Sequence, residues 1–186
     1  MLDKLFTETH ERMDKAVDAV RREFAKIRTG KATVSLLDGV KVDAYGSSVP
    51  LRQVANISVP EARLLVVQPW DKKLLGDIEK SIQSADLGLN PSNDGNIIRV
   101  PIPPLTEERR KELVRYVHKL AEEGRVAVRN VRRDVNESLK EMQKNGDISE
   151  DDYHRAHDKT IQEMTDESIH EIDTALAAKE TELMEV

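Results

Sequence analysis

Four arginines fall within nine residues of the stretch GRVAVRNVRRDVNE, which runs from position 124 to 137. They are Arg125, Arg129, Arg132 and Arg133. A guanidinium group binds phosphate or carboxylate oxygens through paired hydrogen bonds. Because successive residues of an α-helix are rotated by about 100°, the four side chains would form one exposed ridge beside the apolar stripe of the same helix. Such a ridge is typical either of an anion-binding site or of a surface held by ion pairs.

The acidic neighbours of this arginine ridge help to separate the two alternatives. Arg125 has Glu122 three residues before it, and Arg133 has a glutamate four residues after it. Arg129 and Arg132 have no acidic residue three or four positions away, so neither is expected to have an acidic partner on its own helix. Like charges at these spacings destabilise a helix by roughly a few tenths of a kcal/mol per pair. The pattern therefore favours an anionic partner, with ion pairs to the neighbouring helices as the alternative.

The composition limits the kind of nucleic acid that the ridge could bind. The chain has two Phe, one Trp and three Tyr residues, and none of them lies beside the arginines in the sequence. A platform that stacks single-stranded bases is therefore not expected. Arginines on a rigid helix suit the phosphates of structured RNA, where recognition depends on shape and charge. Asn130 and Asn136 could add hydrogen bonds at the same surface.

The charge of this 186-residue chain is unevenly distributed. The 29 basic and 35 acidic residues give a net charge of −6, but residues 106–133 carry +4 and residues 134–186 carry −11. A locally basic face allows an acidic protein to bind nucleic acid. The absence of cysteine excludes disulfides and thiolate chemistry. Because no apolar run is long enough to span a bilayer and no signal-peptide pattern is present, we expect a cytoplasmic protein without membrane association.

Three long amphipathic helices are predicted from apolar residues that recur every three or four positions. The first covers residues 2–27 and the second residues 106–145. The third starts at Ser149, which can cap the helix together with Asp152 three residues later. Seven residues are predicted to share its apolar face: Tyr153, His157, Ile161, Met164, Ser168, Ile172 and Ala175.

Residues 30–104 show a different pattern, with short runs of strand type separated by turns. Alternating residues begin near Val40, and the runs VANISV, LLVVQ and IIRVPIP are typical of further strands. A short helix is predicted to start at Asp71. Trp70 follows LLVVQP and is interpreted as an anchor between the sheet and this helix.

These patterns predict an α+β fold in which a long three-helix bundle is interrupted by an inserted domain. A one-sided apolar helix must bury that side, so residues 1–29 and 105–186 are expected to form the bundle domain. Residues 30–104 would form the small, β-rich α/β domain. The two crossings between the domains are expected to act as a hinge. The hinge residues are Thr29, Gly30, Pro101, Pro103 and Pro104.

Motifs that could support catalysis are scarce. Gly30-Lys31 resembles a fragment of a phosphate-binding loop, but alanine stands where that loop needs its first glycine and its Ser or Thr. His154 and His157 lie one helical turn apart, as two metal ligands would. His157 is instead interpreted as lying on the core-facing stripe and His154 on a solvated face. No catalytic residue, metal site or cofactor is therefore predicted.

Several ordered motifs carry a resemblance to a known family. They are KIRTGKA at the first crossing, DLGLNPSNDGN, IRVPIPPLTEERRKEL at the second crossing, VRNVRRD, SEDD and the final ELMEV. Together they cover essentially the whole chain, and they closely resemble the bacterial ribosome recycling factor family. That family combines a three-helix bundle with a small hinged domain in a transfer-RNA-like outline, and it acts as a monomer without catalytic activity.

The resemblance also implies partners and site residues. Members of the family bind ribosomal RNA of the large subunit after termination. With elongation factor G and GTP, which the elongation factor binds, they separate the subunits so that messenger RNA and deacylated transfer RNA can leave. The motif match places the RNA contacts of the second helix on Arg125, Arg129, Arg132 and Arg133. Arg28 and Lys31 in KIRTGKA are further basic candidates near the hinge, although their charge could simply complement the end of the first helix.

A second hypothesis belongs to another functional class. The chain could be a helical, coiled-coil-like adaptor without RNA binding, whose arginines pair with the acidic third helix. In that case, replacing Arg129 or Arg132 should impair folding rather than large-subunit binding.

Overall fold

The computed structural model describes residues 1–185, and these divide into two compact units. The first unit combines Met1–Arg28 with the chain from Glu107 onward, and the second is Thr29–Thr106. The sequence places the corresponding boundaries at residues 30 and 105. The predicted α+β class is confirmed, because the first unit is helical and the second contains antiparallel sheets. Within residues 1–185, no helix has the length and apolar character needed to cross a membrane.

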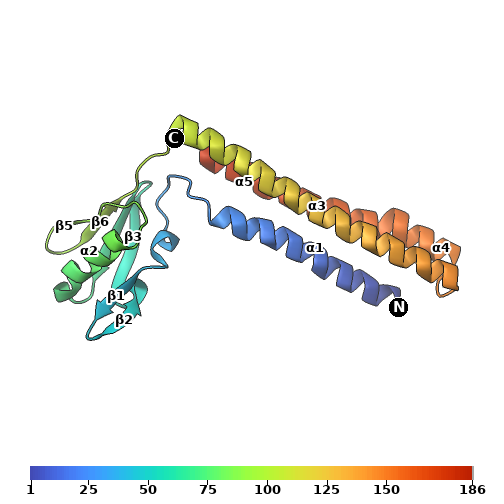
Figure 1. The fold of residues 1–186 in the computed structure, drawn as a ribbon, viewed down its shortest axis with the longest axis horizontal. Coiled ribbons are helices and arrows are strands. Elements are labelled where there is room, and N and C mark those ends of the chain that lie inside the picture. The colour runs from blue at the N-terminus through green and yellow to red at the C-terminus, as the bar shows by residue number, and fades with distance from the viewer. Residues whose placement is uncertain (186) are drawn as a thin grey trace. The chain divides into compact units, whose positions relative to one another are not determined.

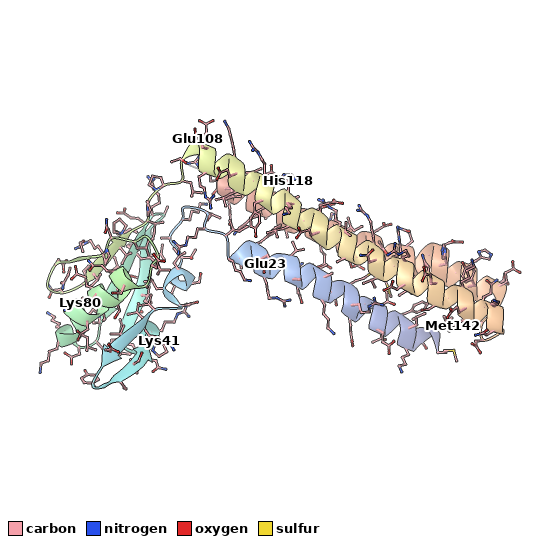
Figure 2. All side chains as sticks on the ribbon, viewed as in Figure 1. Glu23, Lys41, Lys80, Glu108, His118 and Met142 are labelled. Carbon is pink, nitrogen blue, oxygen red and sulfur yellow. The ribbon has the colours of Figure 1, made fainter. Side chains whose placement is uncertain are left out.

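The first unit contains three long helices that lie side by side (Figure 1). Helix α1 covers Leu2–Ala25 and α3 covers Glu107–Asn145. The third helix begins as α4, Glu150–His154, passes through a π-helical segment, Arg155–Thr160, and continues as α5, Ile161–Met184. Figure 2 labels Glu108 near the start and Met142 near the end of α3, with side chains projecting along its outer face.

Local chemistry determines the turn between α3 and α4. Gly146 adopts φ +78°, and its N–H donates to the Gln143 carbonyl at 3.0 Å. The N–H of Asp147 donates to the Met142 carbonyl at 2.9 Å, which completes a glycine-terminated helix end. Three residues after Gly146, the hydroxyl oxygen of Ser149 accepts from the N–H of Asp152 at 3.1 Å. Both the end of α3 and the cap of α4 are therefore confirmed.

The buried face of the third helix differs from the predicted one. Seven residues of this helix are buried: Ala156, Ile161, Thr165, Ser168, Ile172, Leu176 and Leu183. Of the residues predicted to share the apolar face, Ile161, Ser168 and Ile172 are confirmed as buried. The other four, Tyr153, His157, Met164 and Ala175, are only half-buried and lie at the edge of this face. Ala156 and Ile161 are five residues apart, which is the spacing of the π-helical segment between them. The extra residue therefore moves Tyr153 and His157 out of line with the buried residues that follow from Ile161 onward.

Gly124 lies where α1 and α5 both pack closely against α3. A Cβ atom at this position would overlap Val20 Cγ2 on α1 and would lie 3.2 Å from Ile172 Cδ1 on α5. Met13 and Val17 of α1 are also fully or almost fully buried. The long α3 is therefore supported from two sides, and this support holds its remaining face in a fixed orientation.

The second unit is built from two antiparallel sheets, one α-helix and three short 3₁₀ helices, Val34–Leu37, Leu51–Gln53 and Lys72–Leu74. Strands β1 (Lys41–Ala44) and β2 (Ser47–Pro50) form a hairpin. The other sheet has the order β3-β4-β6-β5. Its strands are Ala55–Glu61 (β3), Leu64–Pro69 (β4), Ser92–Asn93 (β5) and Ile98–Pro101 (β6). Helix α2, Leu75–Ser84, buries Ile78 and Ile82 in the same core as Leu65 and Val67.

Trp70 does not anchor the sheet to the helix. Its side chain is 70% exposed, so the predicted anchor is wrong. Strand residues alternate between two faces, and in β4 the buried positions are Leu65, Val67 and Pro69. Trp70 is the next residue and takes the outward position. Ile78 and Ile82 supply the contact that the tryptophan was expected to make.

The two connections between the units have different local structures. Gly30 has φ +76°, and a Cβ atom there would lie 3.3 Å from Leu105 Cγ, which explains why glycine occupies the position. Pro101 is the last residue of β6 and pairs with Leu64, so it belongs to the sheet. The N–H of Ile102 still donates to the Arg63 carbonyl at 2.8 Å. The second connection therefore begins after Ile102, at the predicted hinge residues Pro103 and Pro104, whose role as a hinge stays a prediction.

Candidate nucleic-acid interface

Arg125 is the most strongly tethered member of the arginine ridge. Its Nε donates to Asp173 Oδ1 on α5 at 2.8 Å, and its Nη1 donates to Glu122 Oε2 at 2.9 Å. Only 20% of the side chain is exposed. The hydrogen bond to Asp173 and, secondarily, the one to Glu122 raise the pKa of Arg125 above its ordinary value. This arginine joins α3 to α5 and has little capacity left for an external anion.

Arg129 has an acidic partner that neighbour spacing in the sequence did not predict. Its Nη1 donates to Glu122 Oε1 at 3.1 Å, although the two residues are seven positions apart. Two helical turns bring them onto the same side of α3, and their long side chains cover the remaining distance. Hydrogen bonds from Arg125 and then Arg129 lower the pKa of the Glu122 carboxyl. The prediction that Arg129 lacks a carboxylate on its own helix is wrong.

Arg132 and Arg133 have only neutral hydrogen-bond partners within residues 1–185. Arg132 Nη1 donates to Gln162 Oε1 on α5 at 3.4 Å, and Arg133 Nη2 donates to Asn130 Oδ1 at 3.4 Å. Glu137, the glutamate four residues after Arg133, forms no ion pair with it in the part of the chain that the structure describes. These two guanidinium groups therefore carry the uncompensated charge of the ridge.

An open groove of about 440 Å³ lies beside these arginines. Arg129, Arg132, Arg133 and Lys140 contribute its positive charges, and Glu137 contributes the only carboxylate of its lining. Asn130, Asn136, Tyr153 and His157 complete the lining. The groove thus joins residues of α3 with residues of α4 and the π-helical segment. Its excess of cations suits an anionic ligand such as an RNA phosphate.

The comparisons with known proteins identify the family. The family model for ribosome recycling factor matches residues 20–184. The chain belongs to the ribosome recycling factor family. The ribosome-recycling factors of Bacillus licheniformis and Bacillus subtilis strain 168 are each 55% identical over 186 residues, with complete coverage of both chains. That of Desulfatibacillum aliphaticivorans is 50% identical over 185 residues, also with complete coverage.

Two solved structures of the ribosome recycling factor family are similar to the chain over its full length. A solution structure of the ribosome recycling factor has 46% sequence identity and a TM-score of 0.76, and 98% of that chain is covered. The second structure describes the Thermus thermophilus factor and Escherichia coli elongation factor G bound to the E. coli post-termination complex. It has 47% identity, a TM-score of 0.64 and complete coverage.

The remaining basic candidates suggested by the ribosome recycling factor family lie elsewhere. Arg28 is exposed just beyond the end of α1, and Lys31 is half-buried in the second unit. Neither residue lines the groove beside the arginine ridge. Their contact with RNA stays a prediction.

The histidine pair is engaged in contacts other than metal binding. His157 Nδ1 lies 2.7 Å from Asp158 Oδ1, and His154 Nδ1 lies 3.4 Å from Asp158 Oδ2. The hydrogen bond to His157 is the main cause that lowers the pKa of the Asp158 carboxyl. Over residues 1–185, no group of three or more His, Asp or Glu side chains has the arrangement of a metal site.

Proposed function

We propose that the protein acts in ribosome recycling by binding ribosomal RNA of the large subunit after termination. With elongation factor G and GTP, it then separates the subunits, and messenger RNA and deacylated transfer RNA are released. Two findings support this proposal. The chain belongs to the ribosome recycling factor family, and a relative with 47% identity occurs together with elongation factor G on the post-termination complex.

The RNA-binding part of this proposal is supported by the surroundings of Arg132 and Arg133. Both lack a carboxylate partner within residues 1–185, and both line a groove with a strong excess of positive charge. Guanidinium groups on a rigid helix bind phosphates without a large loss of conformational freedom. RNA phosphates would compensate the charges of Arg132 and Arg133, for which the fold supplies no carboxylate.

The mechanism is mechanical rather than enzymatic. The protein works as a cytoplasmic monomer without a cofactor, and the elongation factor binds and hydrolyses the GTP. The bundle is held on the RNA. The elongation factor exerts its force on the second unit, and the connections at Thr29-Gly30 and Pro103-Pro104 transmit this force to the bundle. The long helices then disrupt contacts between the subunits. The close packing at Gly124 keeps the helices rigid enough to transmit this force.

One observation favours the alternative of a helical adaptor. Arg125 pairs with Asp173, and Arg21 on α1 pairs with Glu171 at 2.7 Å, so the acidic third helix does neutralise some arginines of the bundle. In an adaptor, Arg132 and Arg133 would also be expected to pair with carboxylates of the third helix. Their neutral partners make RNA binding the better explanation.

Binding of purified large ribosomal subunits over a range of salt concentrations tests the proposal. Phosphate contacts release counterions, so the logarithm of the association constant should fall steeply with the logarithm of the salt concentration. Replacing both Arg132 and Arg133 by alanine should reduce this slope by about one to two. A flat salt dependence for the wild type would exclude phosphate contacts as the basis of binding.

A further inference from the structure

Two aromatic rings lie in the groove beside the arginine ridge. Tyr153 comes from α4 and His157 from the π-helical segment, and both line the groove. Their rings are stacked, with centroids 5.4 Å apart and planes inclined by 28°. Both residues are half-buried, so part of each ring is available to a ligand. The sequence places no Phe, Trp or Tyr beside the arginines, but the fold brings these two rings to them.

The π-helical segment explains why these rings are not in the core. A regular apolar repeat predicts that Tyr153 and His157 share the buried face with Ile161. Instead, Ala156 is buried with only 2% exposure, and the segment 155–160 contains the additional residue of a π-helical turn. The stacked rings are consequently presented to the groove. Single π-helical turns within α-helices occur often at functional sites.

Asn136 supplies an unused hydrogen-bonding group at the same groove. Its Oδ1 atom is shielded from solvent and has no hydrogen-bond partner within residues 1–185. A buried acceptor without a partner is unfavourable, and the terminal torsion of an asparagine side chain turns easily. Rotation would present the amide to a ligand in the groove. An amide both donates and accepts, which matches the hydrogen-bonding edge of a nucleobase.

These features are chemically complementary to one nucleotide. We infer that the groove between α3 and α4 holds a single unpaired nucleotide of the bound RNA, with its base against Tyr153 and His157 and its phosphate at Arg132. The amide of Asn136 contacts the edge of the base. This inference rests on the proposed RNA binding and adds a base-specific subsite to it. Stacking on aromatic rings beside cationic groups is how proteins hold unpaired bases.

A nucleotide fits the groove better than an acidic peptide does. The cations of the groove would bind either ligand, but a carboxylate-rich peptide would leave the flat face of the stacked rings without a partner. A base uses the rings, the amide and the charges together. A protein ligand is therefore an outcome that the experiment must be able to detect.

Binding of large ribosomal subunits to Tyr153→Leu and Tyr153→Phe variants tests the subsite. Leucine keeps an apolar side chain but removes the ring, so affinity should fall by about tenfold. Phenylalanine keeps the ring and should bind within about twofold of the wild type. Tyr116→Leu is the matched control, because Tyr116 is an exposed tyrosine of α3 that does not line the groove. It should bind like the wild type, and circular dichroism should show the same helix content in all variants.

Chemical probing of the bound RNA identifies what occupies the groove. The wild type should protect the edge of one unpaired base from alkylation, and Tyr153→Leu should lose this protection while the backbone protection persists. The inference is overturned if Tyr153→Leu binds as tightly as the wild type while Arg132→Ala does not, although the proposed RNA binding then stands. It is also overturned if loss of the ring weakens binding without changing any base reactivity, since a protein contact would then be responsible. Failure of the wild type to bind large subunits would refute both proposals.

Discussion

The guanidinium group of Arg132 on α3 donates to the amide oxygen of Gln162 on α5 at 3.4 Å, whereas Arg125, two turns earlier, is held by the carboxylate of Asp173. The same two helices thus compensate the charge of Arg125 with a carboxylate and leave the charge of Arg132 uncompensated. A neutral partner orients a guanidinium without cancelling its charge. The arginine ridge therefore has an ion-paired end at Arg125 and an end with uncompensated charge at Arg132 and Arg133.

This division predicts opposite phenotypes for two arginine substitutions. Arg125→Ala should lower the free energy of unfolding of the helical unit by about 1 kcal/mol, because it removes two ion pairs and the packing of the side-chain stem. Arg132→Ala should leave the melting temperature unchanged and weaken large-subunit binding by about tenfold, the usual loss for a charged hydrogen bond. Thermal melts followed by circular dichroism and equilibrium binding measure the two effects. Equal loss of stability in both variants would support the adaptor alternative.

We expect Glu122 to compete with RNA for Arg129. Its carboxylate accepts from both Arg125 and Arg129, at 2.9 and 3.1 Å. Glu122→Gln should release Arg129 and strengthen large-subunit binding by about two- to fivefold, since one exposed ion pair contributes up to about 1 kcal/mol. Glu123→Gln is the control, because Glu123 pairs instead with Lys119 at 4.0 Å. Weaker binding by Glu122→Gln would mean that Glu122 positions Arg129 rather than competing for it.

Packing at Gly124 predicts that even a single methyl group at this position destabilises the helical unit. In Gly124→Ala the new methyl group would overlap Val20, and such overpacking costs about 1–3 kcal/mol. The better helix propensity of alanine offsets part of this loss, about 1 kcal/mol. The melting temperature of the helical unit should still fall. Gly76→Ala in α2 is the matched control: its methyl group would meet no atom within 4 Å, so the second unit should be stabilised by about 0.5–1 kcal/mol.

The turn before β6 predicts a pH dependence of the second unit. Hydrogen bonds from the N–H groups of Ile97 and Asn96, and from Arg99, lower the pKa of Asp94 to about 2. A carboxyl whose pKa is lowered on folding stabilises the protein above its unfolded value near 4, and this contribution disappears as the pH falls towards 2. Denaturant unfolding of the wild type should therefore show declining stability over that interval. Asp94→Asn should remove this part of the decline, and an unchanged pH profile would contradict the assignment.

Local signals predicted the helix ends well. The glycine at 146 and the cap at Ser149 depend on residues that are close in sequence, so their types determine the backbone there. The long apolar repeats likewise predicted the helices of the first unit. Trp70 was misassigned because its side depends on where β4 ends, and one residue reverses the direction in which a strand side chain points.

The candidate site required information that lies beyond local spacing. Arg129 reaches Glu122 across two turns, whereas spacings of three and four residues cover only the neighbours within one turn. The groove combines α3 with Tyr153 and His157, which come from another helix, and their approach depends on how the two helices pack. The π-helical segment moves Tyr153 and His157 off the buried face, which the regular apolar repeat did not predict. What the sequence did predict was the uncompensated charge at Arg132, because its nearest helical neighbours include no acid.

Light scattering that monitors the separation of post-termination ribosomes into subunits tests the central claim most directly. The wild type mixed with elongation factor G and GTP should lower the scattering as the subunits part. At the same protein concentration, the Arg132→Ala and Arg133→Ala double variant should split ribosomes at least about tenfold more slowly while its melting temperature is unchanged. Equal splitting rates for the wild type and the double variant, or no splitting by the wild type, would contradict the account.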